Sequence, residues 1–128
     1  MNSRVLLDTS AVIAYLLNEP GEDKVAEALD RAAIAAPNAA EIVAVLMRRG
    51  CGEDEAVFML QQLRVPVVPL DESAALRTGV LIAKTRHLGL SLGDCACLAL
   101  ALERNADVLS ADRQWAKLDF PVCVTLIR

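Results

Sequence analysis

Three aspartates stand beside apolar segments, where a side chain can do chemistry at the edge of a sheet. Asp8 follows the run Val5-Leu6-Leu7, Asp112 follows Val108-Leu109-Ser110-Ala111, and Asp94 opens a stretch that is almost wholly apolar. In open α/β sheets, ligands gather beyond the carboxyl ends of the strands, so acids far apart in the chain can meet in one pocket. Carboxylate oxygens are the ligands that hard divalent cations such as Mg²⁺ or Mn²⁺ prefer. A cation held in that way is the starting point of a site that cleaves phosphodiester bonds.

Each of these carboxylates, and Glu41 with them, also has a purely structural explanation. Asp8 and Asp112 each precede a predicted helix, and aspartate is a favoured N-cap residue. Ser91 and Asp94 have the spacing of a capping box. Glu41 is predicted to lie in the first turn of its helix, where the helix dipole stabilises a negative charge by about 0.3–1 kcal/mol. Taken one at a time, the acids therefore favour a functional site only weakly.

The surroundings of two of the acids favour a shared site. Glu41 lies between Asn38-Ala39-Ala40 and Ile42-Val43-Ala44-Val45, and Asp94 is followed at once by the most apolar predicted helix. A carboxylate against such a helix is costly unless it has a partner, and no Arg or Lys is near Asp94 in the sequence. A divalent metal ion is an efficient partner, and it would also relieve the mutual repulsion of four acids in one pocket.

Length and charge restrict the classes of protein to which the chain can belong. Its 128 residues fit one domain, residues 1–128, and 55% of them are hydrophobic, which is enough for a core and argues against disorder. The net charge of −4 argues against a protein that coats nucleic acid through bulk electrostatics. It does not exclude a nuclease, because carboxylates that bind metal add to the negative count. Contact with nucleic acid must then come from a local basic patch.

The cysteines and the N-terminus are those expected of a protein in a reducing compartment. Cys51, Cys95, Cys97 and Cys123 form no Cys-x-x-Cys pair and His87 is the only histidine, so we expect buried thiols rather than a zinc site. Met1-Asn2-Ser3-Arg4 leads almost at once into a strand and lacks the layout of a signal peptide. The longest apolar stretch, Cys95 to Leu102, is far shorter than the ~20 residues that cross a bilayer. We therefore expect a cytoplasmic protein.

The hydrophobic pattern predicts strands that alternate with helices. Apolar runs predict strands over Val5–Leu7, Val65–Leu70, Asp107–Ser110 and Val122–Ile127, and the two prolines of Val65–Leu70 favour an edge position or a very short strand. Helical periodicity and turn signals predict helices over Ser10–Leu17, Glu22–Ile34, Pro37–Arg49, Glu53–Leu63, Glu72–His87, Leu92–Arg104 and Asp112–Leu118. Strands separated by helices need crossover connections. We therefore expect an α/β fold, a three-layer α/β/α sandwich with a short, mostly parallel central sheet.

Four segments, in this order, resemble the PIN-domain ribonucleases, and most closely the VapC toxins of bacterial toxin–antitoxin pairs. They are Val5-Leu6-Leu7-Asp8-Thr9-Ser10, Asn38-Ala39-Ala40-Glu41, Leu90-Ser91-Leu92-Gly93-Asp94-Cys95-Ala96-Cys97-Leu98-Ala99 and Leu109-Ser110-Ala111-Asp112-Arg113-x-Trp115. The resemblance spans nearly the whole chain, and the Leu-Ser-Leu-Gly-Asp block is its most specific part. Cys95 stands where similar proteins frequently have an arginine, so the basic contact of that arginine is missing from this position.

The resemblance implies a PIN-like fold and a metal-dependent endoribonuclease, a toxin that inhibits translation. Asp8, Glu41, Asp94 and Asp112 would then form the catalytic site and hold Mg²⁺ or Mn²⁺. Asp8 and Asp94 would be the firmest ligands, and Asp112 would complete the set. Glu41 would bind a second ion or orient the attacking water. Also implied are an RNA substrate, a homodimer, and a small antitoxin that lays a segment across the toxin and into its acidic pocket, where an arginine would suit the carboxylates.

Other residues are candidates for contacts with the substrate or the antitoxin. Thr9, Ser10 and Arg86 are candidate substrate contacts, although the two hydroxyls also suit local capping and Arg86 also suits a solvated helix end. The predicted helices Glu22–Ile34 and Glu53–Leu63 carry apolar faces, which either form a groove for the antitoxin or pack on the core.

Three other functions compete with the toxin hypothesis. A phosphotransfer enzyme of the haloacid dehalogenase type needs a second aspartate two residues after the first, and Ser10 stands there. A non-catalytic acidic α/β binding module of the receiver type needs paired acids near the first strand and a lysine after a late strand, and neither is evident. A PIN nuclease that processes RNA as a housekeeping function remains open, because it would have the same acids.

Overall fold

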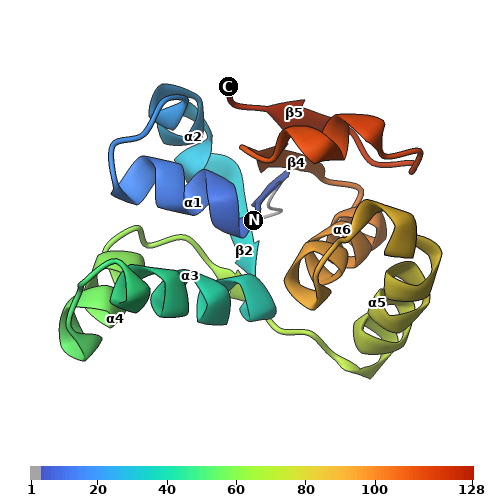
Figure 1. Ribbon diagram of the computed structural model, residues 1–128, viewed down its shortest axis with the longest axis horizontal. Coiled ribbons are helices and arrows are strands. Elements are labelled where there is room, and N and C mark those ends of the chain that lie inside the picture. The colour runs from blue at the N-terminus through green and yellow to red at the C-terminus, as the bar shows by residue number, and fades with distance from the viewer. Residues whose placement is uncertain (1–3) are drawn as a thin grey trace.

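The structure is a computed structural model that describes residues 4–128, and Figure 1 shows how its elements are arranged. The prediction that the N-terminus lacks a signal peptide concerns residues 1–3 in part, and these lie outside the described residues. Within them, five strands form one sheet in the order β3-β2-β1-β4-β5, and every pair of neighbours is parallel. The strands are β1 (Val5–Leu7), β2 (Ala32–Ala35), β3 (Val67–Val68), β4 (Asp107–Ser110) and β5 (Val124–Leu126). Since β1 pairs with both β2 and β4, the carboxyl ends of these three strands lie at one edge of the sheet.

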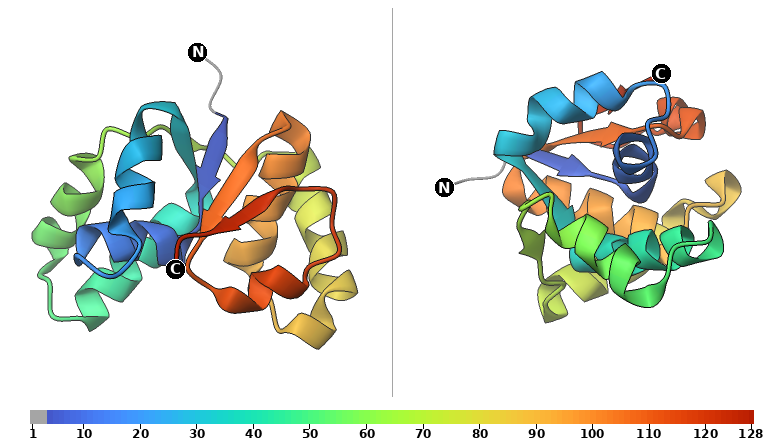
Figure 2. Two further views of the ribbon diagram at one scale, coloured as in Figure 1. Left: turned by 90° about the horizontal axis from the view of Figure 1, so that it is seen from above. Right: turned by 90° about the vertical axis from the view of Figure 1, so that its left-hand side faces the viewer.

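The helices connect successive strands and cover both faces of the sheet, as the two views of Figure 2 show. They are α1 (Thr9–Leu16), α2 (Glu22–Ala28), α3 (Ala36–Arg48), α4 (Glu53–Gln61), α5 (Glu72–Lys84) and α6 (Leu92–Arg104). Short 3-10 helices occur at η1 (Leu29–Arg31), η2 (Arg86–Leu88) and η3 (Arg113–Lys117). Crossover helices between parallel strands are what this connectivity requires.

Successive residues of β1 point into two different cores. Val5 and Leu7 pack in a cluster with side chains of α1, α2, α3 and α4, whereas Leu6 packs in a second cluster with α5, α6 and Trp115 of η3. This alternation follows from the two-residue repeat of a strand. The chain is therefore the predicted three-layer α/β/α sandwich, and both faces of its short central strand are buried.

The predicted helix over Glu22–Ile34 is wrong in its second half. Helix α2 ends at Ala28, and after η1 the chain enters strand β2, whose four residues are all buried. Alanine has the highest helix propensity, so the run Ala32-Ala33-Ile34-Ala35 resembles the end of a helix in sequence. Pairing with β1 on one side and β3 on the other overrides that local preference.

The predictions for the edge strand and for the buried helix are confirmed. Strand β3 is two residues long, lies at the edge of the sheet, and is flanked by Pro66 and Pro69. Helix α6 has the predicted bounds and is buried almost continuously from Gly93 to Ala101. Among the described residues, no helix has the length and apolar character needed to cross a membrane.

Candidate active site

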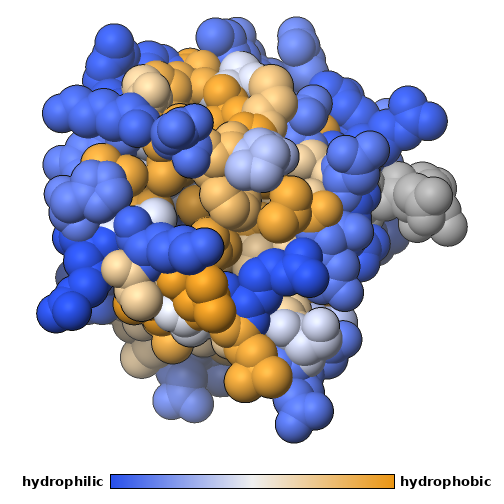
Figure 3. All heavy atoms as spheres, turned by 90° about the vertical axis from the view of Figure 1, so that its right-hand side faces the viewer, coloured by the Kyte–Doolittle hydropathy of each residue, from blue (hydrophilic) through white to orange (hydrophobic). Residues whose placement is uncertain are grey.

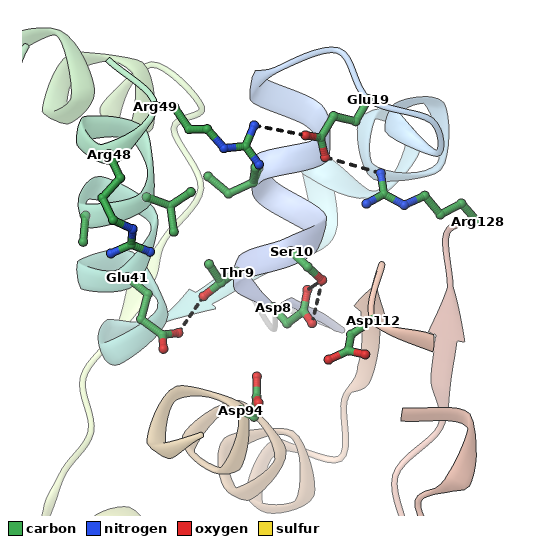
Figure 4. A pocket seen from close by; sticks show the side chains of 13 residues that line it. Asp8, Thr9, Ser10, Glu19, Glu41, Arg48, Arg49, Asp94, Asp112 and Arg128 are labelled. Atoms are coloured by element: carbon green, nitrogen blue, oxygen red, sulfur yellow. Dashed lines mark hydrogen bonds and ion pairs between the residues drawn. The ribbon is translucent and has the colours of Figure 1, made fainter. Parts of the chain in front are cut away.

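The loops that follow β1 and β4 open onto a pocket of about 440 Å³, which Figure 4 shows from close by. Five carboxylates line it: Glu19 and the four acids selected from the sequence, Asp8, Glu41, Asp94 and Asp112. Asp8 directly follows β1, Glu41 lies in α3, Asp94 lies at the start of α6, and Asp112 follows β4. The volume falls within the roughly 300–1,000 Å³ of small-ligand sites.

Asp8 is the most deeply buried of these acids, with 2% of its surface exposed. Its carboxylate accepts hydrogen bonds from Ser10 Oγ and from the Ala11 N–H, both at 2.8 Å, and Ser110 Oγ donates to its Oδ2 atom. Burial raises the pKa of Asp8 from 3.8 to about 6, while these hydrogen bonds lower it and the charge of Asp94 adds to the rise. The bond from Ala11 is the predicted N-cap contact, so one carboxylate both caps α1 and lines the pocket.

Asp94 and Ser91 form the predicted capping box at the start of α6. Asp94 Oδ2 accepts a hydrogen bond from the Ser91 N–H at 2.9 Å, and the Asp94 N–H donates to Ser91 Oγ at 3.1 Å. Burial raises the pKa of Asp94, the hydrogen bonds with Ser91 lower it, and the negative charges of Glu41 and Asp112 raise it again. The acids therefore repel one another, and a cation between them would relieve that repulsion.

Glu41 is held by a polar network that joins three elements. Its Oε1 atom accepts hydrogen bonds from Thr9 Oγ1 at 2.7 Å and from Asn38 Nδ2 at 3.2 Å. Asn38 Nδ2 also lies 3.1 Å from Thr9 Oγ1 and 3.3 Å from the carbonyl oxygen of Gly93. The wholly buried Asn38 thereby connects the start of α1, helix α3 and the start of α6. Sequence reasoning missed this role, although Asn38 and Glu41 are one helical turn apart.

The structural explanation predicted for Glu41 is wrong, whereas the one predicted for Asp112 is confirmed. Glu41 is not in the first turn of its helix, because α3 begins at Ala36 and Glu41 lies in the second turn. The dipole of α3 therefore does not account for its charge. Asp112 is the N-cap of η3, as predicted, and its Oδ1 atom accepts a hydrogen bond from the Gln114 N–H at 3.0 Å.

Gly93 lets the Glu41 carboxylate approach the backbone of α6. A Cβ atom at position 93 would overlap both the Oε1 atom and the carboxyl carbon of Glu41. The obstructing atoms are at the end of a flexible side chain, so Glu41 can move away. That movement would break its hydrogen bonds with Thr9 and Asn38. The glycine of the Leu-Ser-Leu-Gly-Asp block is thus explained by its contact with an acid 52 positions earlier in the sequence.

The substitution Gly93→Ala is therefore expected to displace Glu41 while the fold remains intact. Catalytic activity should fall by about 10–100-fold, as it does when the groups that orient a metal site are disturbed. The free energy of unfolding should change by less than about 1 kcal/mol, because alanine is also the better helix former. Gly79→Ala is the matched control, since Gly79 lies in α5 and a Cβ there meets nothing within 4 Å. Equal activity of the two variants would show that the position of Glu41 is unimportant.

The donor chemistry of the pocket fits a hard divalent cation. Its four candidate ligands supply only carboxylate oxygens, and within residues 4–128 none of them forms an ion pair with Arg, Lys or His. Nor do any three His, Cys, Asp or Glu side chains in that part of the chain come close enough to enclose an ion by themselves. Mg²⁺ commonly binds through one or two carboxylates and keeps several of its waters, so the residues present fit that ion without a closed cage.

A divalent cation is expected to stabilise the protein in a way that depends on pH. Because the folded protein raises the pKa of Asp8 to about 6, this group favours folding most below pH 3.8, and the benefit is lost as the pH rises through 6. Above that pH, the folded chain holds a buried charge that a cation would stabilise. Mn²⁺ should therefore raise the Tm clearly at about pH 8 and much less at about pH 5, measured by calorimetry against EDTA.

Asp71→Asn is the matched control for this pH dependence. Asp71 caps α5 as Asp8 caps α1, with its Oδ1 atom 2.9 Å from the Ala74 N–H, but it does not line the pocket. The variant should keep the wild-type response to Mn²⁺ at both pH values. A gain in Tm that is equal at both pH values in the wild type would contradict a cation bound by Asp8.

Of the three predicted substrate contacts, Thr9 and Ser10 line the pocket and Arg86 does not. Thr9 and Ser10 line the pocket, but their hydroxyls already orient acids: Thr9 donates to Glu41, and Ser10 donates to Asp8. Ser10 Oγ also accepts a hydrogen bond from the Ala111 N–H at 2.9 Å, which ties α1 to the end of β4. Arg86 lies in η2 and is not among the described residues that line the pocket. Contact of these three residues with a substrate stays a prediction.

The lining of the pocket includes three arginines that sequence reasoning did not select: Arg48, Arg49 and Arg128. Arg48 and Arg49 have the positions of basic residues that end a helix, and α3 does end there. That local explanation conceals their second property, which is that they lie on the wall of the acidic pocket. Only the packing of α3 against α1 and α6 reveals it.

A comparison with protein families and a comparison with solved structures both find proteins that are similar to this chain. The sequence model of the PIN domain family matches residues 5–121. The DNA-bound VapBC structure from Salmonella typhimurium is similar over 100% of both chains, with a TM-score of 0.77 and 18% identity. VapBC-5 from Mycobacterium tuberculosis is similar over 98% of both chains, with a TM-score of 0.64 and 26% identity. PAE2754 from Pyrobaculum aerophilum is similar over 99% of this chain and 92% of its own, with a TM-score of 0.66 and 18% identity. No curated protein sequence matches the chain.

Proposed function

The chain belongs to the PIN domain family, and from that premise we propose that it is a metal-dependent endoribonuclease, the toxin of a toxin–antitoxin pair. Residues 1–128 would form its single nuclease domain, and it would inhibit translation by cutting RNA in the cytoplasm. The observation that carries the proposal is the convergence of Asp8, Glu41, Asp94 and Asp112 on one pocket. Asp8, Asp94 and Asp112 also contribute to helix caps, but capping does not require them to share one pocket with Glu41, and a cation among the four acids would relieve their repulsion.

The proposed metal ligands are the same four acids, with Asp8 and Asp94 as the firmest. When bound, Mg²⁺ or Mn²⁺ would supply an activated water and would neutralise the charge that develops on the phosphate. Asp8 is ionised above its pKa of about 6 and is kept in one orientation by Ser10, Ser110 and the Ala11 N–H. These fixed donors give the ligand a set direction before any ion arrives.

Glu41 is proposed to orient the attacking water or to hold a second ion. Thr9 and Asn38 both donate to its Oε1 atom, so its Oε2 atom would be the one to accept a proton from a water molecule. Asn38 and Gly93 would act as positioning residues, because they fix where that carboxylate lies. Asp112, on the opposite wall, would complete the acidic set.

The proposed partner is a small antitoxin protein. Similar structures include a toxin–antitoxin complex from Klebsiella pneumoniae, with a TM-score of 0.71 and 17% identity. A guanidinium group of the antitoxin would suit the unpaired acids of the pocket. Helix α4 exposes Val57 and Phe58 and offers an apolar surface for such a partner. The groove first expected along Glu22–Ile34 would be shorter, since α2 ends at Ala28.

Homodimerisation is proposed for the side of the molecule that carries α5. Leu76 and Val80 are one helical turn apart and are 69% and 53% exposed. Figure 3 shows that apolar side chains gather on this face. A contiguous apolar surface of this kind is typical of a protein interface.

The proposal is tested by incubating the purified protein with RNA in the presence of Mg²⁺, Mn²⁺ or EDTA. Cleavage should require the metal and should stop in EDTA; cleavage that persists in EDTA would contradict the mechanism. No cleavage of any RNA would favour a non-catalytic binding module. Growth arrest on expression, relieved by a small neighbouring gene, would distinguish a toxin from a housekeeping nuclease.

A further inference from the structure

The pocket has a basic wall as well as an acidic one. Arg48, Arg49 and Arg128 line it together with the four acids, and within the described residues no other arginine or lysine does so. In a chain of net charge −4, a cluster of guanidinium groups beside the candidate active site is a local departure from the overall charge. It supplies the local basic patch that contact between an acidic protein and nucleic acid requires.

The arginines approach the acids from two directions. Arg48 follows Glu41 by seven positions in α3, which is two turns, so the two side chains extend from the same side of the helix. Figure 4 shows the Arg48 guanidinium directed toward the pocket above Glu41, with Arg49 and Arg128 farther out along the wall. A chain that passes over the acids therefore meets these guanidinium groups beside them.

Glu19 holds two of the three arginines. Its Oε2 atom lies 3.6 Å from Arg49 Nη1, and its Oε1 atom lies 3.3 Å from Arg128 Nη1. Arg128 Nη1 also donates to the carbonyl oxygen of Pro20 at 3.1 Å, and the Arg128 carbonyl accepts a hydrogen bond from Arg113 Nη1 at 2.9 Å. These contacts hold both the guanidinium group and the backbone of Arg128 in place beside the pocket.

A structural ion pair does not by itself account for this arrangement. In both pairs the arginine side chain is exposed, while that of Glu19 is 25% exposed, and ion pairs near the surface contribute little to stability. Glu19 pairs with only two of the three arginines, and within residues 4–128 Arg48 forms no ion pair, although four more acids line the same pocket. A guanidinium has five N–H donors, so Arg49 and Arg128 keep donors for another anion while Glu19 orients them.

We propose that Arg48, Arg49 and Arg128 form a phosphate-binding rim, which holds the backbone of RNA beside the acidic end of the pocket. This inference rests on the proposed function and adds the residues that bind its substrate. Guanidinium groups pair with phosphate oxygens in a fixed, two-pronged geometry. Such contacts place the strand in register without reading its bases. Glu19 is the positioning residue of the rim, because it directs Arg49 and Arg128.

The test is a set of single substitutions, Arg48→Gln, Arg49→Gln and Arg128→Gln, with Arg77→Gln on α5 as the control. The probe is a fluorescently labelled single-stranded RNA that the wild type cleaves; binding is measured in EDTA by anisotropy at several salt concentrations, and cleavage is measured in Mn²⁺. Each rim variant should raise KM by about three- to tenfold and leave kcat within about twofold, because the contact is made in the ground state and the transition state alike. The slope of log K against log salt should fall by about 0.7 for each lost phosphate contact.

Two further measurements separate binding from folding. Arg48→Lys should keep the wild-type salt slope, since the charge remains, and all rim variants should keep the wild-type rise of Tm with Mn²⁺. Unchanged KM in all three variants of a protein that still cleaves RNA would overturn the rim alone. If Arg86→Gln raised KM and none of the rim variants did, that result would also overturn the rim alone. A wild type that neither binds nor cleaves RNA would overturn both the rim and the proposed function.

Discussion

Asp94→Asn is expected to lower the rate of RNA cleavage by about a thousandfold or more, well beyond the ~10–100-fold typical of residues that only orient a metal site. Asparagine has nearly the same shape, and its Oδ1 atom can still accept the hydrogen bond from the Ser91 N–H that caps α6. The fold should therefore persist while one negative charge of the pocket is lost. Single-turnover cleavage in saturating Mn²⁺ measures the effect.

The control for this substitution is Asp71→Asn, which changes a helix-capping aspartate that is remote from the pocket. Its cleavage rate should equal that of the wild type. Cleavage by the Asp94→Asn variant within about tenfold of the wild-type rate would show that Asp94 acts only as a cap, because a lost metal ligand costs more than a lost outer-shell partner.

Asp8→Asn is expected to abolish cleavage and at the same time to stabilise the metal-free protein. The folded state raises the pKa of Asp8 from 3.8 to about 6, so ionisation of this group opposes folding at neutral pH. A shift of about two pK units corresponds to roughly 3 kcal/mol, and the imperfect fit of an amide to the hydroxyls of Ser10 and Ser110 would offset part of it. We expect a gain of about 1–3 kcal/mol in the free energy of unfolding at about pH 8.

Urea unfolding in EDTA at several pH values measures this gain. It should be largest above pH 6, should shrink as the pH falls through that value, and should vanish below pH 3.8, where the wild-type carboxyl is neutral in both states. Mn²⁺ should no longer raise the Tm of the variant. A variant less stable than the wild type at about pH 8 would show that the carboxylate supports the fold, contrary to the cost of an unpaired buried charge.

The parts of the fold that carry local signals could be predicted from the sequence. Helix α6 has the predicted bounds because Ser91 and Asp94 cap its start and Arg104 lies in its last turn. Strand β4 has its predicted bounds as well, since its apolar run is short and ends at a polar residue. Strand β2 could not be predicted, because its alanines favour a helix locally and only its neighbours β1 and β3 make it a strand.

The candidate site divides in the same way. The three aspartates could be selected because each follows or opens an apolar segment, and the topology of a parallel sheet then brings such positions together. Glu41 joined them through the resemblance to PIN-domain ribonucleases. Asn38 and Gly93 could not be selected, since their roles depend on contacts with Thr9 and Glu41 from other elements. Arg48 and Arg49 could not be selected for a different reason. Basic residues are favoured at the end of a helix, so their positions in the sequence need no functional site to explain them.

The anomalous scattering of Mn²⁺ in crystals of the protein would show directly whether the acids of the pocket bind a metal ion. A peak is expected between Asp8, Asp94 and Asp112, and it should be absent in crystals of the Asp94→Asn variant. A peak elsewhere on the molecule, or none in crystals soaked at a concentration of Mn²⁺ that supports RNA cleavage in solution, would contradict metal binding by these acids.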